Sequence, residues 1–197
     1  MKTRIMLYLF LAVSFVIVGG CSQPKTEQAC QQCVDFELPL TVGTKFGSTA
    51  GQQSGDVIFK TNGIIVSVLK FITAAGTKTF GNMTIGNPPI QFSKGQAANT
   101  NTNLGFDFSN IGFTPIEVQF EFLDWGAIQN ISVNGSNPYI GKLSAAPSSI
   151  GGVSVAVYTA PVSGKSASKG VVILRGPVKN LMVGGQEFWL DQVCARR

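Results

Sequence analysis

Residues 116–122 read Ile116-Glu117-Val118-Gln119-Phe120-Glu121-Phe122, and this alternation of apolar and polar side chains is the clearest indication of the fold. Successive side chains of a β-strand point to opposite faces, so we expect the even positions to face a core and the odd positions to face water. Similar alternation, or a short run rich in Ile, Val and Phe, recurs along the chain. These further predicted strands are residues 33–38, 56–60, 63–72, 77–85, 106–108, 131–133, 153–158, 171–174 and 185–193.

Turn-forming residues separate these segments. Asn62-Gly63 suits a tight hairpin, and Gly86-Asn87-Pro88-Pro89 interrupts any strand ladder. Residues 93–103, 145–152 and 163–169 are predicted loops because they are rich in small or polar residues. No stretch after Val18 shows a helical period. The pattern therefore predicts an all-β, antiparallel sandwich or barrel that forms one domain.

The composition argues against several classes of protein. Of the 197 residues 44% are hydrophobic and 13% are charged, and none is histidine. Histidine bases, Ser-His-Asp triads and histidine metal ligands are thereby excluded. Glu117 and Glu121 would lie roughly 13 Å apart on one strand, too far for the usual glycosidase pair. We expect a protein that is not an enzyme.

The first residues have the pattern of an export signal. Lys2 and Arg4 precede an uncharged run over residues 5–18, which is shorter than a membrane-spanning helix. Val18-Gly19-Gly20-Cys21 resembles the lipobox of bacterial lipoproteins. The resemblance implies that residues 1–20 are removed and that Cys21 carries diacylglycerol and a further acyl chain, such as palmitate. An ordinary cleaved signal and an uncleaved helix are the alternatives.

The same resemblance predicts where the protein lies. Residues 21–32 are polar and are expected to form a tether. Ser22 stands where an Asp would favour the inner membrane, so we expect an exported, lipid-anchored protein of the outer membrane or cell surface, if the host has an outer membrane. Removal of Lys2 and Arg4 lowers the formal net charge from +5 to +3. This charge is too small to indicate a nucleic-acid partner.

The four cysteines are Cys21, Cys30, Cys33 and Cys194. An exported chain meets an oxidising compartment, where disulfides form. We favour a Cys33–Cys194 bridge, which would join the first predicted strand to the last. Pairing of Cys30 with Cys194 or with Cys33 stays open.

The two ends of the predicted domain resemble those of jelly-roll carbohydrate-binding modules. Cys33-Val34-Asp35-Phe36-Glu37 opens the domain, and Gly184-Gly185-Gln186-Glu187-Phe188-Trp189-Leu190-Asp191-Gln192-Val193-Cys194 closes it. The resemblance implies a jelly-roll-like sandwich over residues 33–194. It also implies a structural calcium held by Glu37 and Asp191, with Asp35 as a spare ligand and backbone carbonyls completing the shell. Gln192 departs from the second acid of that pattern, and acids that only face solvent are the alternative.

Sugar-binding sites stack aromatic rings on the sugar and use amides and carboxylates for its hydroxyls. Trp125, Tyr139, Asp124 and Asn134 cluster in sequence around predicted turns and are the candidate glycan ligands. Packing of Trp125 against the core is the alternative for that residue. We therefore expect a lipid-anchored glycan-binding protein; the alternative is a structural lipoprotein that contacts another envelope protein through a sheet edge or a loop.

Overall fold

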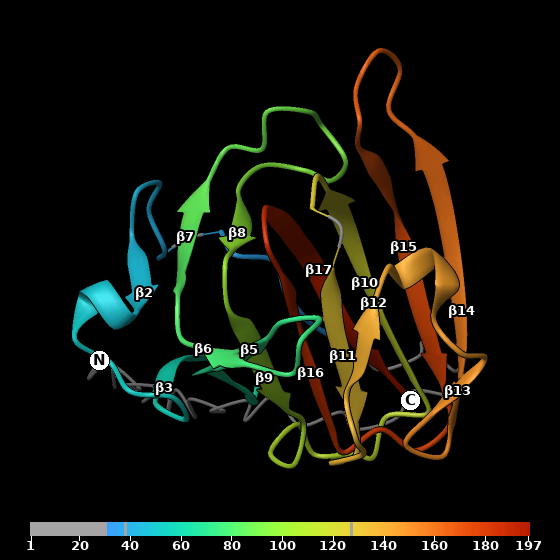
Figure 1. The fold of residues 1–197 in the computed structure, drawn as a ribbon. Coiled ribbons are helices and arrows are strands. Elements are labelled where there is room, and N and C mark those ends of the chain that lie inside the picture. The colour runs from blue at the N-terminus through green and yellow to red at the C-terminus, as the bar shows by residue number, and fades with distance from the viewer. Residues whose placement is uncertain (1–30, 38, 127) are drawn as a thin grey trace, which may run out of the picture.

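The computed structural model describes residues 31–37, 39–126 and 128–197. Two antiparallel sheets pack face to face in a single domain (Figure 1), which confirms the predicted all-β sandwich. The predicted signal peptide, Cys21, Cys30 and most of the predicted tether lie outside the described residues. Within the described residues, no helix is both long enough and apolar enough to cross a membrane.

The large sheet has nine strands. In spatial order they are β13 (Ser149–Ile150), β14 (Val153–Pro161), β15 (Ser168–Arg175), β10 (Glu117–Asp124), β17 (Phe188–Arg196), β8 (Ala97–Thr100), β7 (Asn82–Gly86) and β2 (Lys45–Gly47), and β1 (Gln31–Val34) also pairs with β17.

The small sheet has six strands and faces the large one. Its order is β12 (Tyr139–Gly141), β11 (Gln129–Val133), β16 (Asn180–Gly185), β9 (Asn103–Asp107), β4 (Ile64–Leu69) and β3 (Val57–Thr61). A separate hairpin consists of β5 (Phe71–Ile72) and β6 (Lys78–Thr79), and two short 3-10 helices are η1 (Ser48–Ala50) and η2 (Leu143–Ala145).

Eight of these strands are connected as in a jelly roll. The neighbours β8, β17, β10 and β15 lie in the large sheet, and β9, β16, β11 and β12 lie in the small sheet. From β8 onward the chain crosses between the sheets after β8, β9, β10, β12, β15 and β16, so neighbours in sequence often lie in opposite layers. Strands β13, β14, β7, β2, β4 and β3 extend the sheet edges.

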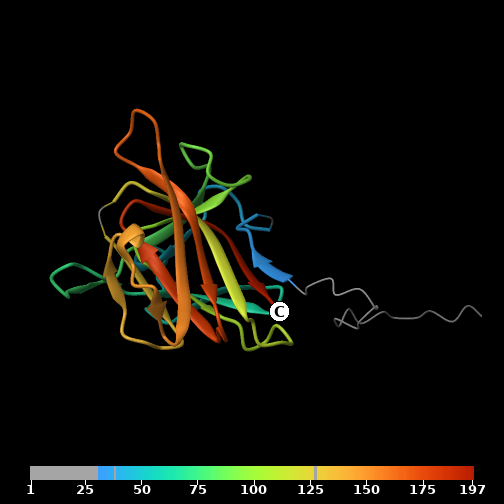
Figure 2. The same ribbon diagram turned by 90° about the vertical axis from the view of Figure 1, so that its right-hand side faces the viewer.

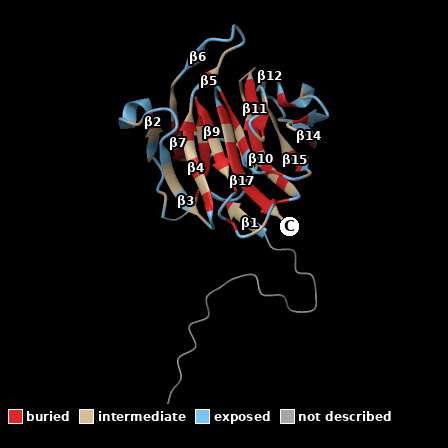
Figure 3. Ribbon diagram, turned by 90° about the horizontal axis from the view of Figure 1, so that it is seen from below, coloured by how far each residue is buried: buried red, intermediate tan, exposed pale blue. Residues whose placement is uncertain are grey.

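The core lies between the two sheets, as the alternation predicts. Val118, Phe120 and Phe122 of β10 are at most 1% exposed, whereas Glu117 and Glu121 remain partly exposed. Figure 3 shows the same distribution over the sandwich, with buried residues on the central strands and exposed residues on the turns and the β5–β6 hairpin.

Several sequence-based assignments are wrong. The predicted loops over residues 145–152 and 163–169 contain β13 and the start of β15, and the predicted strand over residues 77–85 is divided into β6 and β7. The predicted loop over residues 93–103 contains β8, where Ala97 and Ala98 are buried and the Thr100 hydroxyl donates to the Phe188 carbonyl at 3.1 Å. The predicted strand over residues 63–72 breaks after Leu69. Its last residues form β5, because the Asn130 side chain bonds both the N–H and the C=O of Ile72.

The Cys33–Cys194 disulfide is present, and the pairing favoured from the sequence is confirmed. The two residues are direct partners in the antiparallel register of β1 and β17, with 4.1 Å between their Cα atoms. This register begins at Gln31, two residues before the predicted domain boundary.

The sandwich has two ends that differ in what they carry. Gln31, Arg196 and Glu117 lie level on neighbouring strands, so the chain leaving the predicted tether enters here. We call this the tether end; seen from below, it shows β1 beside the C-terminus (Figure 3). Asp124 and Phe188 lie level at the opposite, distal end, beyond which the β14–β15 hairpin projects (Figure 2).

Candidate ligand-binding site

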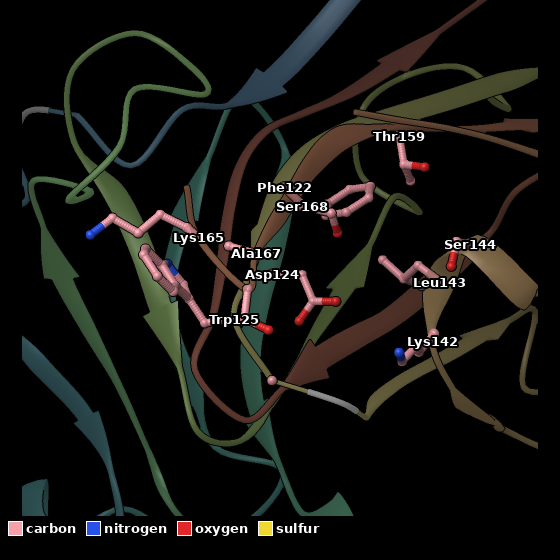
Figure 4. A pocket seen from close by; sticks show the side chains of 12 residues that line it. Phe122, Asp124, Trp125, Lys142, Leu143, Ser144, Thr159, Lys165, Ala167 and Ser168 are labelled. Carbon is pink, nitrogen blue, oxygen red and sulfur yellow. The ribbon is translucent and has the colours of Figure 1, made fainter. Parts of the chain in front are cut away.

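A cavity of about 400 Å³ opens at the distal end, where β10 finishes. Its walls come from three parts of the chain, namely the end of β10, the segment that includes η2, and the β14–β15 hairpin (Figure 4). The lining residues are Phe122, Asp124, Trp125, Gly126, Lys142, Leu143, Ser144, Thr159, Lys165, Ser166, Ala167 and Ser168. Hydroxyl groups, two lysines and one carboxyl make this a polar cavity.

The alternation of β10 places Asp124 and Trp125 on different sides of the strand. Asp124 continues the inward series of Phe120 and Phe122, and its carboxyl lies in the middle of the lining residues (Figure 4). Trp125 leaves the strand on the other side and lies beside Lys165 (Figure 4). Asp124 and Trp125, two of the predicted ligand residues, therefore both line the cavity, but their side chains lie on different sides of β10.

The Asp124 carboxyl is held in place by a buried glutamine. Gln129 donates from Nε2 to Asp124 Oδ1 at 2.8 Å, and its Oε1 accepts from the Leu143 N–H at 3.1 Å. Gln129 is 0% exposed, so both bonds are sheltered from water. This residue connects β10 to η2 and fixes the two walls of the cavity. Sequence analysis missed this residue, because its only signal is a polar side chain at an inward strand position.

Burial raises the pKa of Asp124 to about 6, while a backbone hydrogen bond at Gly126 and the positive charge of Lys142 lower it. The carboxyl can therefore accept or donate a hydrogen bond within the neutral range. Among the described residues that line the cavity there is no second carboxyl, so the pair that glycosidases use is not found there.

Trp125 has a buried indole N–H that finds no partner among the described residues. Its ring is partly exposed, so it belongs neither fully to the core nor to the surface. A buried donor without an acceptor costs free energy, and a ligand oxygen could relieve that cost.

The structure places Tyr139 and Asn134 outside the cavity lining. The Tyr139 hydroxyl donates to the Lys142 carbonyl at 3.0 Å and so supports the segment that lines it. Asn134 lies beyond the opposite end of β11 from Gln129, with φ of 53°. Its amide donates to the carbonyls of Gly151 and Pro177 and accepts from the Lys179 N–H. Asn134 therefore joins three turns at the tether end and is not brought to the cavity.

The two predicted calcium ligands have different environments. Glu37 accepts hydrogen bonds from the backbone and side-chain nitrogens of Gln96 at 2.7 and 3.3 Å. Asp191 is 0% exposed, and its Oδ1 accepts from the Gln192 N–H at 2.7 Å. Its Oδ2 makes no hydrogen bond of ordinary geometry among the described residues, although the Ser93 hydroxyl, which is likewise buried and unpartnered, lies near enough to act on the carboxyl.

Burial raises the pKa of Asp191 to about 7. The nearby Ser93 hydroxyl and the Gln192 N–H lower this pKa, and the charges of Glu121 and Asp35 raise it further. Asp35, the predicted spare calcium ligand, is thus one of the acids whose charge raises the pKa of Asp191. Within the described part of the chain, no three Asp, Glu, Cys or His side chains are grouped so that they could hold a metal ion.

Comparisons with protein-family models, with curated proteins and with solved structures gave no match for this chain.

Proposed function

We propose that this protein is a lipid-anchored cell-envelope protein whose β-sandwich binds a glycan in the cavity at the distal end. The observation that carries the proposal is the half-buried Asp124 carboxyl, fixed by Gln129 in a polar cavity of about 400 Å³. That volume lies within the range of small-ligand sites. The lipid anchor rests on the lipobox resemblance at Cys21.

The chemistry of the cavity suits a sugar. A carboxyl with a pKa near 6 pairs with sugar hydroxyls as donor or acceptor, and Ser144 and Ser168 offer further hydroxyls. The Trp125 indole N–H is a donor that needs an acceptor. Phe122 and Leu143, which are at most 2% exposed, close the floor of the cavity.

The position of the cavity fits display on a membrane. The chain enters the domain at Gln31, and Asp124 lies seven residues along β10 from the level of that entry. At about 3.3 Å per residue this separates the cavity from the tether end by roughly 23 Å. A glycan would therefore be bound on the side away from the anchor.

We expect that residues 22–197 deplete one glycan class from a polysaccharide panel. Asp124→Asn and Trp125→Phe should each weaken that binding by about 10- to 100-fold, because the first removes the carboxylate without a change of shape and the second removes the indole N–H together with part of the ring. Affinity electrophoresis in the retained polysaccharide measures the loss. Tyr158→Ala is the control, since this aromatic residue is 60% exposed and lies outside the cavity. The glycan site would be contradicted if Tyr158→Ala alone lost glycan binding, or if the wild-type protein bound no glycan.

A structural calcium at Asp191 belongs to the same proposal. The unpartnered, buried Oδ2 is an oxygen of the kind that calcium takes, and the charges of Asp35 and Glu121 act on the same carboxyl. Backbone carbonyls would have to complete the shell. Calcium would relieve the cost of an ionised buried carboxyl; the pH experiment in the Discussion includes this test.

A second candidate function, contact with another envelope protein, is favoured by the edge of β14. The Val155 N–H bonds to Ser148, so the backbone groups of Val157 and Thr159 point away from β15 in the same direction. No strand among the described residues pairs with this part of the edge. The nine residues of β14 carry no charge, although charged side chains commonly protect such edges.

If β14 recruits a strand from a partner, Tyr158→Lys with Ala160→Lys should abolish recovery of a stoichiometric protein from envelope extracts. Both side chains are exposed, so the fold is expected to tolerate the change. Asp124→Asn is the matched control, because it changes the cavity and leaves the edge intact. Recovery of the same partner by the lysine variant would exclude the edge as the contact.

A further inference from the structure

The net charge of the described chain is concentrated at the tether end. Five cations lie on the turns and strand ends that are level with Gln31 and Arg196, together with two anions, Asp107 and Glu117. The five cations are Lys60, Arg175, Lys179, Arg196 and Arg197. Elsewhere in the described residues, seven lysines are balanced by seven acids.

Pairing between strands brings these charges together. Arg175, Glu117 and Arg196 are neighbours across β15, β10 and β17. Both arginines bond the Glu117 carboxylate, at 3.1 and 3.0 Å, so this acid is already neutralised. In the small sheet Lys60 pairs with Ile65, and Ile65 pairs with Asp107. Lys60 and Asp107 therefore lie at the same height along their strands.

Contacts between the layers place both sheets' charges on one surface. The Asn62 side chain in the β3–β4 turn donates to the Cys33 carbonyl in β1 at 2.9 Å. The Asn134 amide joins the turn at Pro177 to the turn at Gly151. Lys179 follows in the same turn, and its side chain is exposed, as are those of Lys60 and Arg197.

We infer that the tether end is a docking surface for anionic phospholipid head groups. Clustered cations next to a membrane attachment point are drawn to negative lipids within about one Debye length, roughly 10 Å. A tether of ten residues keeps the domain within reach of the bilayer, since it spans at most about 35 Å. Docking by this end would hold the domain upright and leave the cavity free.

The test uses residues 22–197 without lipid, so that its outcome does not depend on lipidation of Cys21. All described residues and the whole core between the sheets lie within this part of the chain. Flotation with phosphatidylcholine vesicles that contain about 30% phosphatidylglycerol, in about 30 mM salt, should recover the protein, and pure phosphatidylcholine should not. Physiological salt should weaken the binding strongly.

Charge reversal distinguishes this surface from general electrostatic attraction. Lys60→Glu, Lys179→Glu and Arg197→Glu together should lower the partition constant by about 100-fold or more, because each cation near an anionic surface contributes about fivefold. Lys70→Glu, Lys78→Glu and Lys94→Glu change the net charge equally at exposed sites elsewhere and should leave most binding intact. Thermal unfolding confirms that both variants are folded.

Equal losses in the two triple variants, equal binding to neutral vesicles, or no vesicle binding by the wild type would overturn the inference. Glycan binding measured on the same variants should be unchanged. Failure of the membrane surface can thereby be separated from failure of the cavity.

Discussion

Replacing Cys33 and Cys194 together by alanine is expected to lower the free energy of unfolding by about 4–5 kcal/mol. The bridge spans 161 residues, and closing so long a loop removes much of the conformational freedom of the unfolded chain. A loss of this size is a large fraction of the stability of an ordinary domain, about 5–15 kcal/mol. Urea unfolding of wild type and variant at equal ionic strength measures it.

Cys30 provides the control for this prediction. Cys30→Ser should leave the unfolding midpoint unchanged, because Cys33 and Cys194 already pair with each other. Reduction of the wild-type protein with dithiothreitol should lower its stability by about as much as the double replacement. The prediction fails if Cys30→Ser costs as much as the double alanine variant, since the bridge would then involve Cys30.

Replacing Asp191 by asparagine is expected to stabilise the protein above neutral pH. The pKa of Asp191 is about 7 in the folded chain, against an ordinary value of 3.8. Because the folded-state pKa is raised, the contribution of this group to stability is fully present below pH 4 and is lost as the pH rises to about 7. The shift corresponds to a loss on the order of 4 kcal/mol.

Urea unfolding at pH values from about 4.5 to 8 would test this sign. Wild-type stability should fall over the range, and Asp191→Asn should lack most of the fall; Asp124, whose pKa is also raised, adds a smaller loss in the same direction. Asp56→Asn, at an exposed carboxyl, is the control. A variant less stable than wild type at pH 8 would contradict the prediction.

The same samples test the proposed calcium. Millimolar calcium should recover much of the wild-type stability lost at high pH, because a bound cation favours the ionised carboxyl. Asp191→Asn should show little response. If calcium has no effect on either protein, the calcium proposal is wrong and the pH prediction stands.

Local alternation was enough to predict the layers of the fold, because the period of two assigns each side chain to core or solvent directly. It predicted β10 with its buried side chains Val118, Phe120 and Phe122, but the strand begins at Glu117, and Ile116, expected in the core, is 58% exposed. It missed β8, where Ala97 and Ala98 show no apolar-polar alternation and the strand depends on pairing with the distant β17. The length of a strand likewise depends on contacts with distant parts of the chain. Asn130, for example, bonds to Ile72 and holds it in a separate hairpin.

The candidate site was predictable only in part for the same reason. Asp124 and Trp125 stand at a strand end, where ligand residues are common, and both line the cavity. Gln129, Lys142 and Thr159 join them only through the register of β10, β11 and β14, which no spacing in the sequence reveals. Asn134 is near Trp125 in the chain but is separated from it by the length of β11.

The disulfide also determines how the molecule would respond to tension. A pull between Gln31 and the C-terminus passes from β1 through the Cys33–Cys194 bond directly into β17. Residues 34–193 lie outside that covalent path and would not be extended. Tension applied between these two points would therefore bypass the sheets that form the cavity.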